Sequence, residues 1–222
     1  MSGNASGKAK DSGAVRACWL GSIGAGMCIS LGCIAYVRVG GALGAFLFSI
    51  GLFFILFAGF ELFTGKACYL YDTIYSPKEF KWWPLVWFGN LCGTMFFVVI
   101  YKFCGFDVEP VKAIAEAKME LPLWQLFFRA ALCNACIFIA VRAWKDGTDG
   151  IIKYGGVVLG VMVFVLCGFE HCVADMFYLA IHNTRFRPAM GRLLVVTAGN
   201  IVGAWLMGTP YDAVKRLQEG KI

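Results

Sequence analysis

Histidine is the side chain whose charge changes most readily near neutral pH, and this chain of 222 residues contains two histidines. His171 directly follows the triplet Gly168-Phe169-Glu170 inside an apolar region, where an ionisable side chain is a functional candidate by default. The alternative is a neutral histidine satisfied by a backbone carbonyl. His182, near polar and basic residues, is expected at a membrane–water interface.

Two other chemistries open to histidine and cysteine are not favoured. The two histidines would lie about 16 Å apart along one helix at 1.5 Å per residue, so they cannot bind opposite faces of one haem. Cys133 and Cys136 form a CxxC pair, but no second pair follows at zinc spacing. The sequence also has no recognisable catalytic triad or glycine-rich phosphate loop. We therefore expect no cofactor, no bound metal and no enzymatic activity.

The composition indicates what surrounds these residues. Apolar residues make up 59% of the chain and charged residues 15%, with a mean hydropathy of +0.70, against about 45–50% and 25% in soluble proteins. The net charge of +6 comes from basic residues that separate apolar segments instead of forming one stripe, so nucleic-acid binding is not indicated. The sequence predicts an all-α integral membrane protein in a lipid bilayer.

Six apolar segments approach the roughly 20 residues that a membrane-spanning helix needs. They cover residues 17–37, 41–60, 82–103, 123–144, 155–169 and 193–208. The second and the fifth are each followed by a polar interruption and a half-length apolar stretch, at 67–74 and 173–181. We therefore expect helices 2 and 5 to be broken. The predicted organisation is a flexible tail at 1–16, one transmembrane domain at 17–208 and a short C-terminal tail at 209–222.

The two halves of the chain repeat the same motifs in the same order. GFE ends at Glu61 and again at Glu170, and GNxxG follows at Gly89 and again at Gly199. Three spans per half is an odd number, so the second half enters the membrane from the opposite side. This predicts an inverted repeat of 17–105 and 121–208. The loops on the side of both termini carry more Lys and Arg, which predicts cytoplasmic termini.

Helix breaks at matching positions of inverted repeats indicate a substrate path. Unpaired backbone groups cost several kcal/mol in hydrocarbon, so a break persists only where it is buried in protein or lines a wet cavity. In the first break, Thr64 offers a hydroxyl, Gly65 permits a left-handed backbone, and Leu62 and Phe63 supply apolar bulk to close a pore. The alternative for this segment is a capped turn that never meets substrate.

These residues resemble the formate/nitrite transporter family. Residues 168–176, GFEHCVADM, are similar to the family signature GFEHSxANM. Residues 62–65, 128–134 and 199–203 resemble the interrupted second helix, the fourth helix and the sixth helix of that family. The resemblance extends over about 21–208. It implies an aquaporin-like bundle of six helices, assembled as a homopentamer with one pore in each subunit.

The resemblance also implies roles for single residues. It makes His171 the central pore histidine, Thr64 its hydrogen-bonding neighbour and Asn134 a pore-side asparagine. Lys118 and Lys153 match basic residues that attract anions at the two mouths. The positions that match the apolar constriction are Phe48, Leu52, Leu62, Phe63 and Phe164.

Acidic residues beside the breaks need a separate explanation, because a carboxylate repels anions. We expect Glu61 and Glu170 to accept backbone N–H groups at the breaks. Asp175 stands where the family usually has asparagine, and Cys172 stands where serine is common. We expect Asp175 to be protonated or engaged by a donor, and the protonated form is favoured because burial in a membrane disfavours the charge. The residues expected to support the breaks are Glu61, Glu170, Gly65, Asp175 and Asn200.

The predicted function is a pH-dependent, proton-coupled channel or transporter for small monovalent anions of weak acids in the cytoplasmic membrane. A bare anion faces a prohibitive desolvation cost in an apolar pore, whereas a proton from water or through His171 makes it a neutral acid that can cross. Formate is favoured, then nitrite or hydrosulfide, and short carboxylates such as acetate or lactate remain open. The alternatives are a neutral-solute pore for water or ammonia and a membrane-embedded redox subunit.

Overall fold

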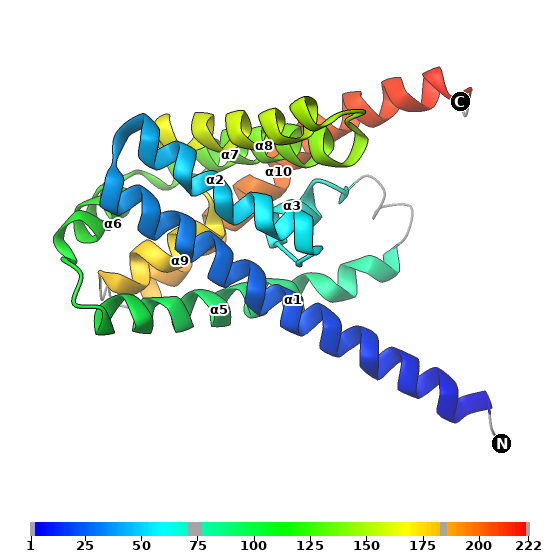
Figure 1. The fold of residues 1–222 in the computed structure, drawn as a ribbon, viewed down its shortest axis with the longest axis horizontal. Helices are drawn as coiled ribbons and strands as arrows, with labels where there is room; N and C mark the ends of the chain where they lie inside the picture. The colour runs from blue at the N-terminus through cyan, green and yellow to red at the C-terminus, as the bar shows by residue number, and fades with distance from the viewer. Residues whose placement is uncertain (1–2, 71–76, 183–185, 221–222) are drawn as a thin grey trace.

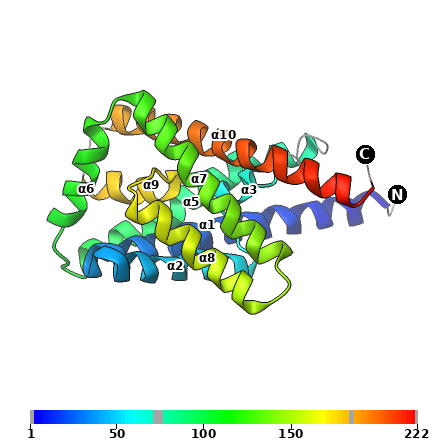
Figure 2. The ribbon, with the colours of Figure 1, turned by 90° about the horizontal axis from the view of Figure 1, so that it is seen from above.

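The chain folds into an elongated bundle of helices (Figures 1 and 2). The computed structural model describes residues 3–70, 77–182 and 186–220, and all regular elements in these ranges are helical. They are α1 (Gly3–Val39), α2 (Gly41–Ala58), α3 (Phe63–Ala67), the 3₁₀ helix η1 (Pro77–Trp82), α5 (Trp83–Phe103), α6 (Glu109–Glu120), α7 (Leu123–Asp146), α8 (Gly150–Leu166), α9 (Cys172–Ile181) and α10 (Phe186–Gln218). Within the described ranges, α1, α2, α5, α7 and α10 contain stretches long and apolar enough to cross a membrane, while α8 and α9 are shorter apolar helices.

Glycine ends the first part of each broken helix. Gly59 and Gly168 begin the two GFE motifs and have φ angles of 67° and 65°, in the left-handed region that residues with a Cβ atom rarely adopt. The sequence-based prediction that Gly65 supplies this conformation is wrong, because Gly65 lies inside the helical turn of α3. The left-handed conformation is needed at Gly59, where α2 ends, and not at Gly65.

The two half-length helices begin where the backbone first finds a partner. The sequence predicts a start at Ala67, but α3 starts at Phe63, where the N–H of Phe63 is bonded to a side chain of α5. Residues 71–74 of the predicted stretch lie outside the described residues. In the second half, α9 begins at Cys172, one residue before the predicted start.

Hydropathy also underestimates the length of the outer helices. Helix α1 extends to Gly3 and α10 extends to Gln218, beyond the predicted apolar limits, because hydropathy detects only the part of a helix that lipid or protein buries. Arg142 of α7 binds Asp212 of α10 with N···O distances of 3.0 and 3.2 Å. This buried ion pair attaches the C-terminal extension of α10 to the bundle, at the end where both termini project (Figures 1 and 2).

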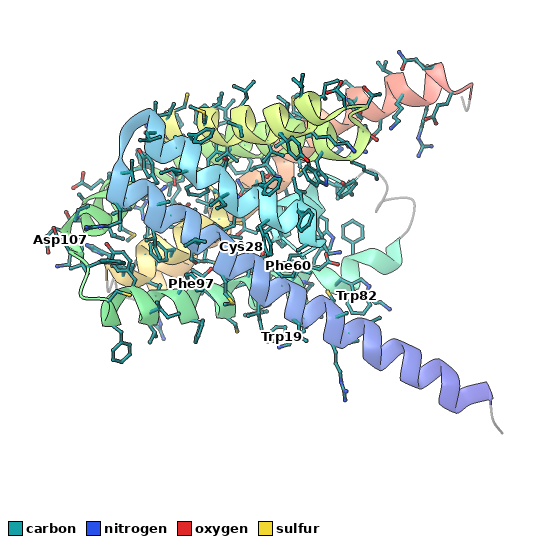
Figure 3. All side chains as sticks on the ribbon, viewed as in Figure 1. Trp19, Cys28, Phe60, Trp82, Phe97 and Asp107 are labelled. Atoms are coloured by element: carbon teal, nitrogen blue, oxygen red, sulfur yellow. The ribbon has the colours of Figure 1, made fainter. Side chains whose placement is uncertain are left out.

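Helix α6 lies at the opposite end of the bundle and was not predicted (Figure 1). It joins the two halves of the chain, and Figure 3 shows the nearby Asp107 at this end, far from Trp82. Pro110 stands in its first turn, and Val111 and Ala115, four residues apart, are buried. Its average hydropathy is too low to predict a membrane span, but the proline and the buried i, i+4 pair are typical of a short amphipathic helix.

Glycine also permits close packing between the long helices. Helix α5 packs along α1, and α10 packs along α7. A Cβ atom on Gly93 would lie 2.0 Å from the carbonyl oxygen of Ile23, and one on Gly203 would lie 2.0 Å from that of Ala131. The second glycine of each GNxxG motif therefore brings two helix backbones into contact, as small residues do in membrane proteins.

We predict that Gly203→Ala will destabilise the protein, because the new methyl group must displace the backbone of α7. Overpacking of this kind costs about 1–3 kcal/mol, and the expected result is a lower midpoint in a thermal unfolding scan of the detergent-solubilised protein. Gly155→Ala is the matched control, because a Cβ atom on Gly155 meets nothing within 4 Å. Equal midpoints for the two variants would contradict the packing argument.

Candidate functional site

The side chain of Asn90, on α5, holds the first helix break together. Its Oδ1 accepts the backbone N–H of Phe63 at 2.9 Å. Its Nδ2 donates to the carbonyl oxygen of Glu61 at 2.9 Å and to that of Ser22 on α1 at 2.8 Å. One buried amide thus satisfies backbone groups on both sides of the break and attaches them to α1.

Asn200, on α10, does the same for the second break. Its Oδ1 accepts the backbone N–H of Cys172 at 3.0 Å, and its Nδ2 donates to the carbonyl oxygens of Glu170 at 2.9 Å and Ala130 at 2.8 Å. The asparagines of the two GNxxG motifs therefore make equivalent hydrogen bonds. The sequence predicted support of the break by Asn200 alone, although Asn90 occupies the same second position of the other GNxxG motif.

The glutamates of the two GFE motifs have a different role from the one predicted. Their side chains were expected to accept backbone N–H groups at the breaks, and instead they form ion pairs. Glu61 binds Lys66 at 2.8 Å, and Glu170 binds Lys118 of α6. The asparagine amides already occupy the backbone groups, so the carboxylates remain available for cations.

Thr64 and His171 meet at the centre of the bundle. Both are buried, and the Thr64 Oγ1 atom lies 3.0 Å from Nε2 of His171. Nδ1 of His171 accepts the backbone N–H of Ala174 at 3.2 Å and caps α9. Since Nδ1 is an acceptor, the proton of the neutral ring is on Nε2, which donates to Thr64. This geometry favours an uncharged His171, because a second proton on Nδ1 would face the N–H of Ala174.

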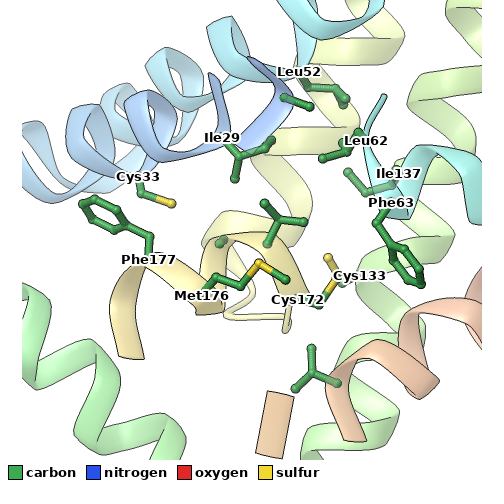
Figure 4. Packing of buried hydrophobic residues seen from close by; sticks show 14 of the residues in the cluster. Ile29, Cys33, Leu52, Leu62, Phe63, Cys133, Ile137, Cys172, Met176 and Phe177 are labelled. Atoms are coloured by element: carbon green, nitrogen blue, oxygen red, sulfur yellow. The ribbon is translucent and has the colours of Figure 1, made fainter. Parts of the chain in front are cut away.

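Apolar and aromatic side chains surround this contact. The ring of Phe164 stacks on that of His171 with 5.6 Å between centroids, and Phe48 meets Phe164 edge to face at 5.6 Å. Leu52 and Leu62 are also buried. Figure 4 shows Leu52 and Leu62 near one another, with Cys133, Cys172 and Met176 grouped below them. The contact between Thr64 and His171 therefore lies in a tightly packed, apolar section.

Asn134, on α7, also reaches this centre. Its Nδ2 donates to the backbone oxygen of Thr64 at 3.3 Å. Its Oδ1 is buried and has no hydrogen-bond partner in the described part of the chain. A buried unpaired acceptor is costly, so this oxygen is a candidate contact for a donor that passes through the protein.

Two cavities approach the packed section from different sides. The first has a volume of about 430 Å³ and is lined by Tyr36, Phe48, Ile114, Ala117, Lys118, Leu121, Arg129, Phe164, Val165, Gly168, Phe169, Glu170, His171, Ala174, Asp175 and Tyr178. The second has about 500 Å³ and is lined by Leu52, Ile55, Leu56, Gly59, Phe60, Glu61, Leu62, Gly65, Lys66, Tyr69, Val141, Trp144 and Lys145. We call them the first and the second vestibule. Of the predicted constriction, Phe48 and Phe164 line the first, Leu52 and Leu62 line the second, and Phe63 packs on Trp83 instead.

The first vestibule contains a buried cluster of charges. The ammonium group of Lys118 binds Glu170 and lies 2.8 Å from Oδ1 of Asp175. Burial opposes the charge of Lys118, but the carboxylates of Asp175 and Glu170 outweigh burial and raise the pKa of Lys118 above its ordinary value. Asp175 is therefore held in an ion pair with Lys118, although its Oδ1 makes no hydrogen bond within the described part of the chain.

The second vestibule has basic residues other than the one predicted. Lys66 pairs with Glu61 at its wall, and the ammonium of Lys145 lies 4.3 Å from the centre of the Tyr69 ring. Lys153 is half-buried on α8 and is not among the residues that line either vestibule in the described ranges. Lys145 lies eight residues earlier in the sequence, so position along the chain alone does not identify which lysine reaches the cavity.

His182 lies at the C-terminal end of α9, outside both vestibules. Its Nε2 is 3.3 Å from Oε1 of Glu116 on α6. His182 therefore lies near the end of the bundle and not at its centre, which agrees with the expectation of an interfacial residue.

Comparison with known proteins gives consistent results. Residues 2–212 match the family model described as "Formate/nitrite transporter". The chain is 32% identical over 220 residues to the nitrite transporter NirC of Escherichia coli, covering 87% of this chain and 81% of NirC. Among solved structures, it is similar to an "FNT family ion channel" (TM-score 0.81, 29% identity, 89% of each chain). It is also similar to a "Pentameric formate channel with formate bound" (TM-score 0.79, 25% identity, 92% of this chain and 98% of the other).

We predict that Asn200→Ala will strongly destabilise the second break. The substitution leaves the buried N–H of Cys172 and the buried carbonyl of Glu170 without this partner, at about 1–3 kcal/mol for each unsatisfied group, and it removes the bond that attaches them to α7. The expected result is loss of the folded oligomer in size-exclusion chromatography, or a clear fall in its unfolding midpoint. Gln125→Ala is the control, because it removes a side-chain amide, on α7, that makes no hydrogen bond in the described chain. An Asn200→Ala protein as stable as this control would show that the break holds without the amide.

Proposed function

Because this chain belongs to the formate/nitrite transporter family, whose members are membrane transporters and channels and not enzymes, we propose that it carries small monovalent anions of weak acids through its own helical bundle. The chain is a multi-pass membrane protein. The observation that supports the proposal is the position of the hydrogen bond between Thr64 and His171, which lies between two vestibules in a packed apolar section.

The proposed architecture has six membrane-spanning helices in two inverted repeats, with an aquaporin-like arrangement. The equivalent bonding of Asn90 and Asn200 supports the repeat. Helix α8 has 17 residues and is about 26 Å long at 1.5 Å per residue, close to the 30 Å of a bilayer core. The likeness to a pentameric formate channel supports a homopentamer with one pore in each subunit.

The anion passes the packed section as its neutral acid. A bare charge between Phe48, Phe164, Leu52 and Leu62 loses its hydration and gains too few partners to compensate. Lower polarity in the vestibule raises the pKa of the corresponding acid, so the anion takes up a proton before it enters the packed section.

Water is the favoured source of this proton. Nδ1 of His171 already accepts the N–H of Ala174, so a charged His171 would lose its helix cap. His171 instead offers the Nε2–H as a hydrogen-bond donor, shared between Thr64 and the substrate. The free Oδ1 of Asn134 can accept the O–H of the acid.

Formate and nitrite are the favoured substrates. A relative is named for nitrite, and a similar structure was solved with formate bound. Hydrosulfide remains a further candidate from the sequence. We place the protein in the cytoplasmic membrane with both termini inside, following the distribution of basic residues.

We predict that purified protein in liposomes will conduct formate and nitrite, and that flux will be faster at pH 6 than at pH 8. More of each anion is protonated at the lower pH, and the neutral acid is the form that crosses. The measurement is a flux panel with formate, nitrite, hydrosulfide and acetate at both pH values. Flux of water or ammonia that ignores pH and anion concentration would contradict the proposal and favour a neutral-solute pore.

We predict that Thr64→Val will lower the rate of formate flux about tenfold. Valine is nearly isosteric but cannot accept the Nε2–H of His171, and a barrier higher by about 1.4 kcal/mol is a factor of ten in rate. Thr209→Val is the control, because Thr209 is exposed and bonds only within α10. An unchanged rate for Thr64→Val would reduce Thr64 to a residue that caps a turn.

A further inference from the structure

The cation predicted to attract anions in the first vestibule is already paired with two carboxylates of the protein. An ammonium group has three N–H donors. Lys118 donates to Glu170, lies at ion-pair distance from Asp175, and has its ammonium 5.7 Å from the centre of the Tyr178 ring. The side chain of Lys118 is 13% exposed and those of both carboxylates are 2% exposed. An anion that binds Lys118 must compete with two carboxylates that already balance its charge.

Asp175 is the residue that completes this arrangement. The equivalent position in the first half of the chain is Lys66, since each lies five residues after the glutamate of its GFE motif. In the first half, one lysine faces one carboxylate, Glu61. In the second half, one lysine faces two carboxylates, so the positive charge of Lys118 is at least balanced.

Arg129 is the other cation of the first vestibule. It is half-buried on α7 and lines the same cavity as His171 and Glu170. Its backbone oxygen accepts the N–H of Glu170 at 3.5 Å, which fixes the position of this part of α7 beside the break. Its guanidinium group forms no ion pair or hydrogen bond within the described chain. A charged side chain in a membrane-spanning helix is costly unless it faces a partner or a wet cavity.

We propose that Arg129, and not Lys118, captures the anion in the first vestibule, and that its guanidinium group selects planar anions with two oxygen atoms. This inference deepens the proposed function and rests on it. The guanidinium group presents parallel N–H donors in a rigid plane. Formate and nitrite present two oxygens in a plane at a matching spacing, so two parallel hydrogen bonds form. Hydrosulfide accepts at one atom and gains little from the fork.

The first test is Arg129→Lys in proteoliposomes. Lysine retains the charge but loses the fork, so the half-saturating concentration of formate and of nitrite rises about tenfold, as expected for loss of one charge-assisted hydrogen bond. The half-saturating concentration of hydrosulfide changes less than about threefold. Arg187→Lys is the matched control, since Arg187 is exposed and lines neither vestibule. Equal changes for formate and hydrosulfide, or no change, would overturn the proposal.

The second test restores a cation. Arg129→Gln raises the half-saturating concentration of every anion, and addition of Asp175→Asn to it reverses part of this loss, because Lys118 then faces one carboxylate and not two. The effect of Asp175→Asn on anion affinity is measured both in the wild type and in Arg129→Gln. If the gain in affinity is equally large in both, Lys118 and not Arg129 is the capture residue.

The third test measures anion binding directly, in the unsubstituted protein and without a transport assay. Phenylglyoxal modifies arginine side chains, and peptide mapping reports the rate of modification at Arg129 in the detergent-solubilised protein. Formate and nitrite should slow this reaction at Arg129 but not at Arg187, and chloride should have little effect. Protection without flux in liposomes would refute the proposed transport function and leave the binding site intact. Flux without protection at Arg129 would refute the binding site alone.

Discussion

A helix that breaks inside a membrane must have its open backbone groups satisfied by protein, and two asparagine amides do this here. Asn90 and Asn200 each bind an N–H on one side of a break and a carbonyl on the other. The short glycine contacts at Gly93 and Gly203 bring the long helices close enough for these amides to reach. The positions of Thr64 and His171 follow, because each lies next to a residue whose backbone an amide holds.

The sequence predicted the features that recur in both halves of the chain. It missed those that depend on which side chains lie close together in the fold. GFE and GNxxG identified both breaks, since a motif that recurs in both halves indicates equivalent positions, whereas the contact between Thr64 and His171 was expected from the family resemblance. The sequence did not show whether the asparagines or the glutamates would bind the backbone groups at the breaks. Both side chains offer suitable acceptors, and only the fold determines which of them lies close enough. Hydropathy likewise missed α6, whose buried side is only a few residues wide.

The charges near the breaks differ between the two halves of the chain. In the first half the cation and the carboxylate lie on the same short segment, as Glu61 and Lys66. In the second half both residues at these positions are acidic, and the cation comes from α6. A helix that connects the two halves thereby becomes part of the site, which explains why it packs against α9 despite its polar sequence.

The nearness of the two vestibules also affects how the protein experiences voltage. Phe48 lines one vestibule and Leu52 the other, and one helical turn, about 6 Å, separates them along α2. Where solution reaches both residues, the membrane potential falls across this short distance and not across the roughly 30 Å of the bilayer core, so the local electric field is about five times steeper. A molecule that crosses this turn without charge does no work against that field, and its net movement therefore depends on concentration and acidity but not on membrane voltage.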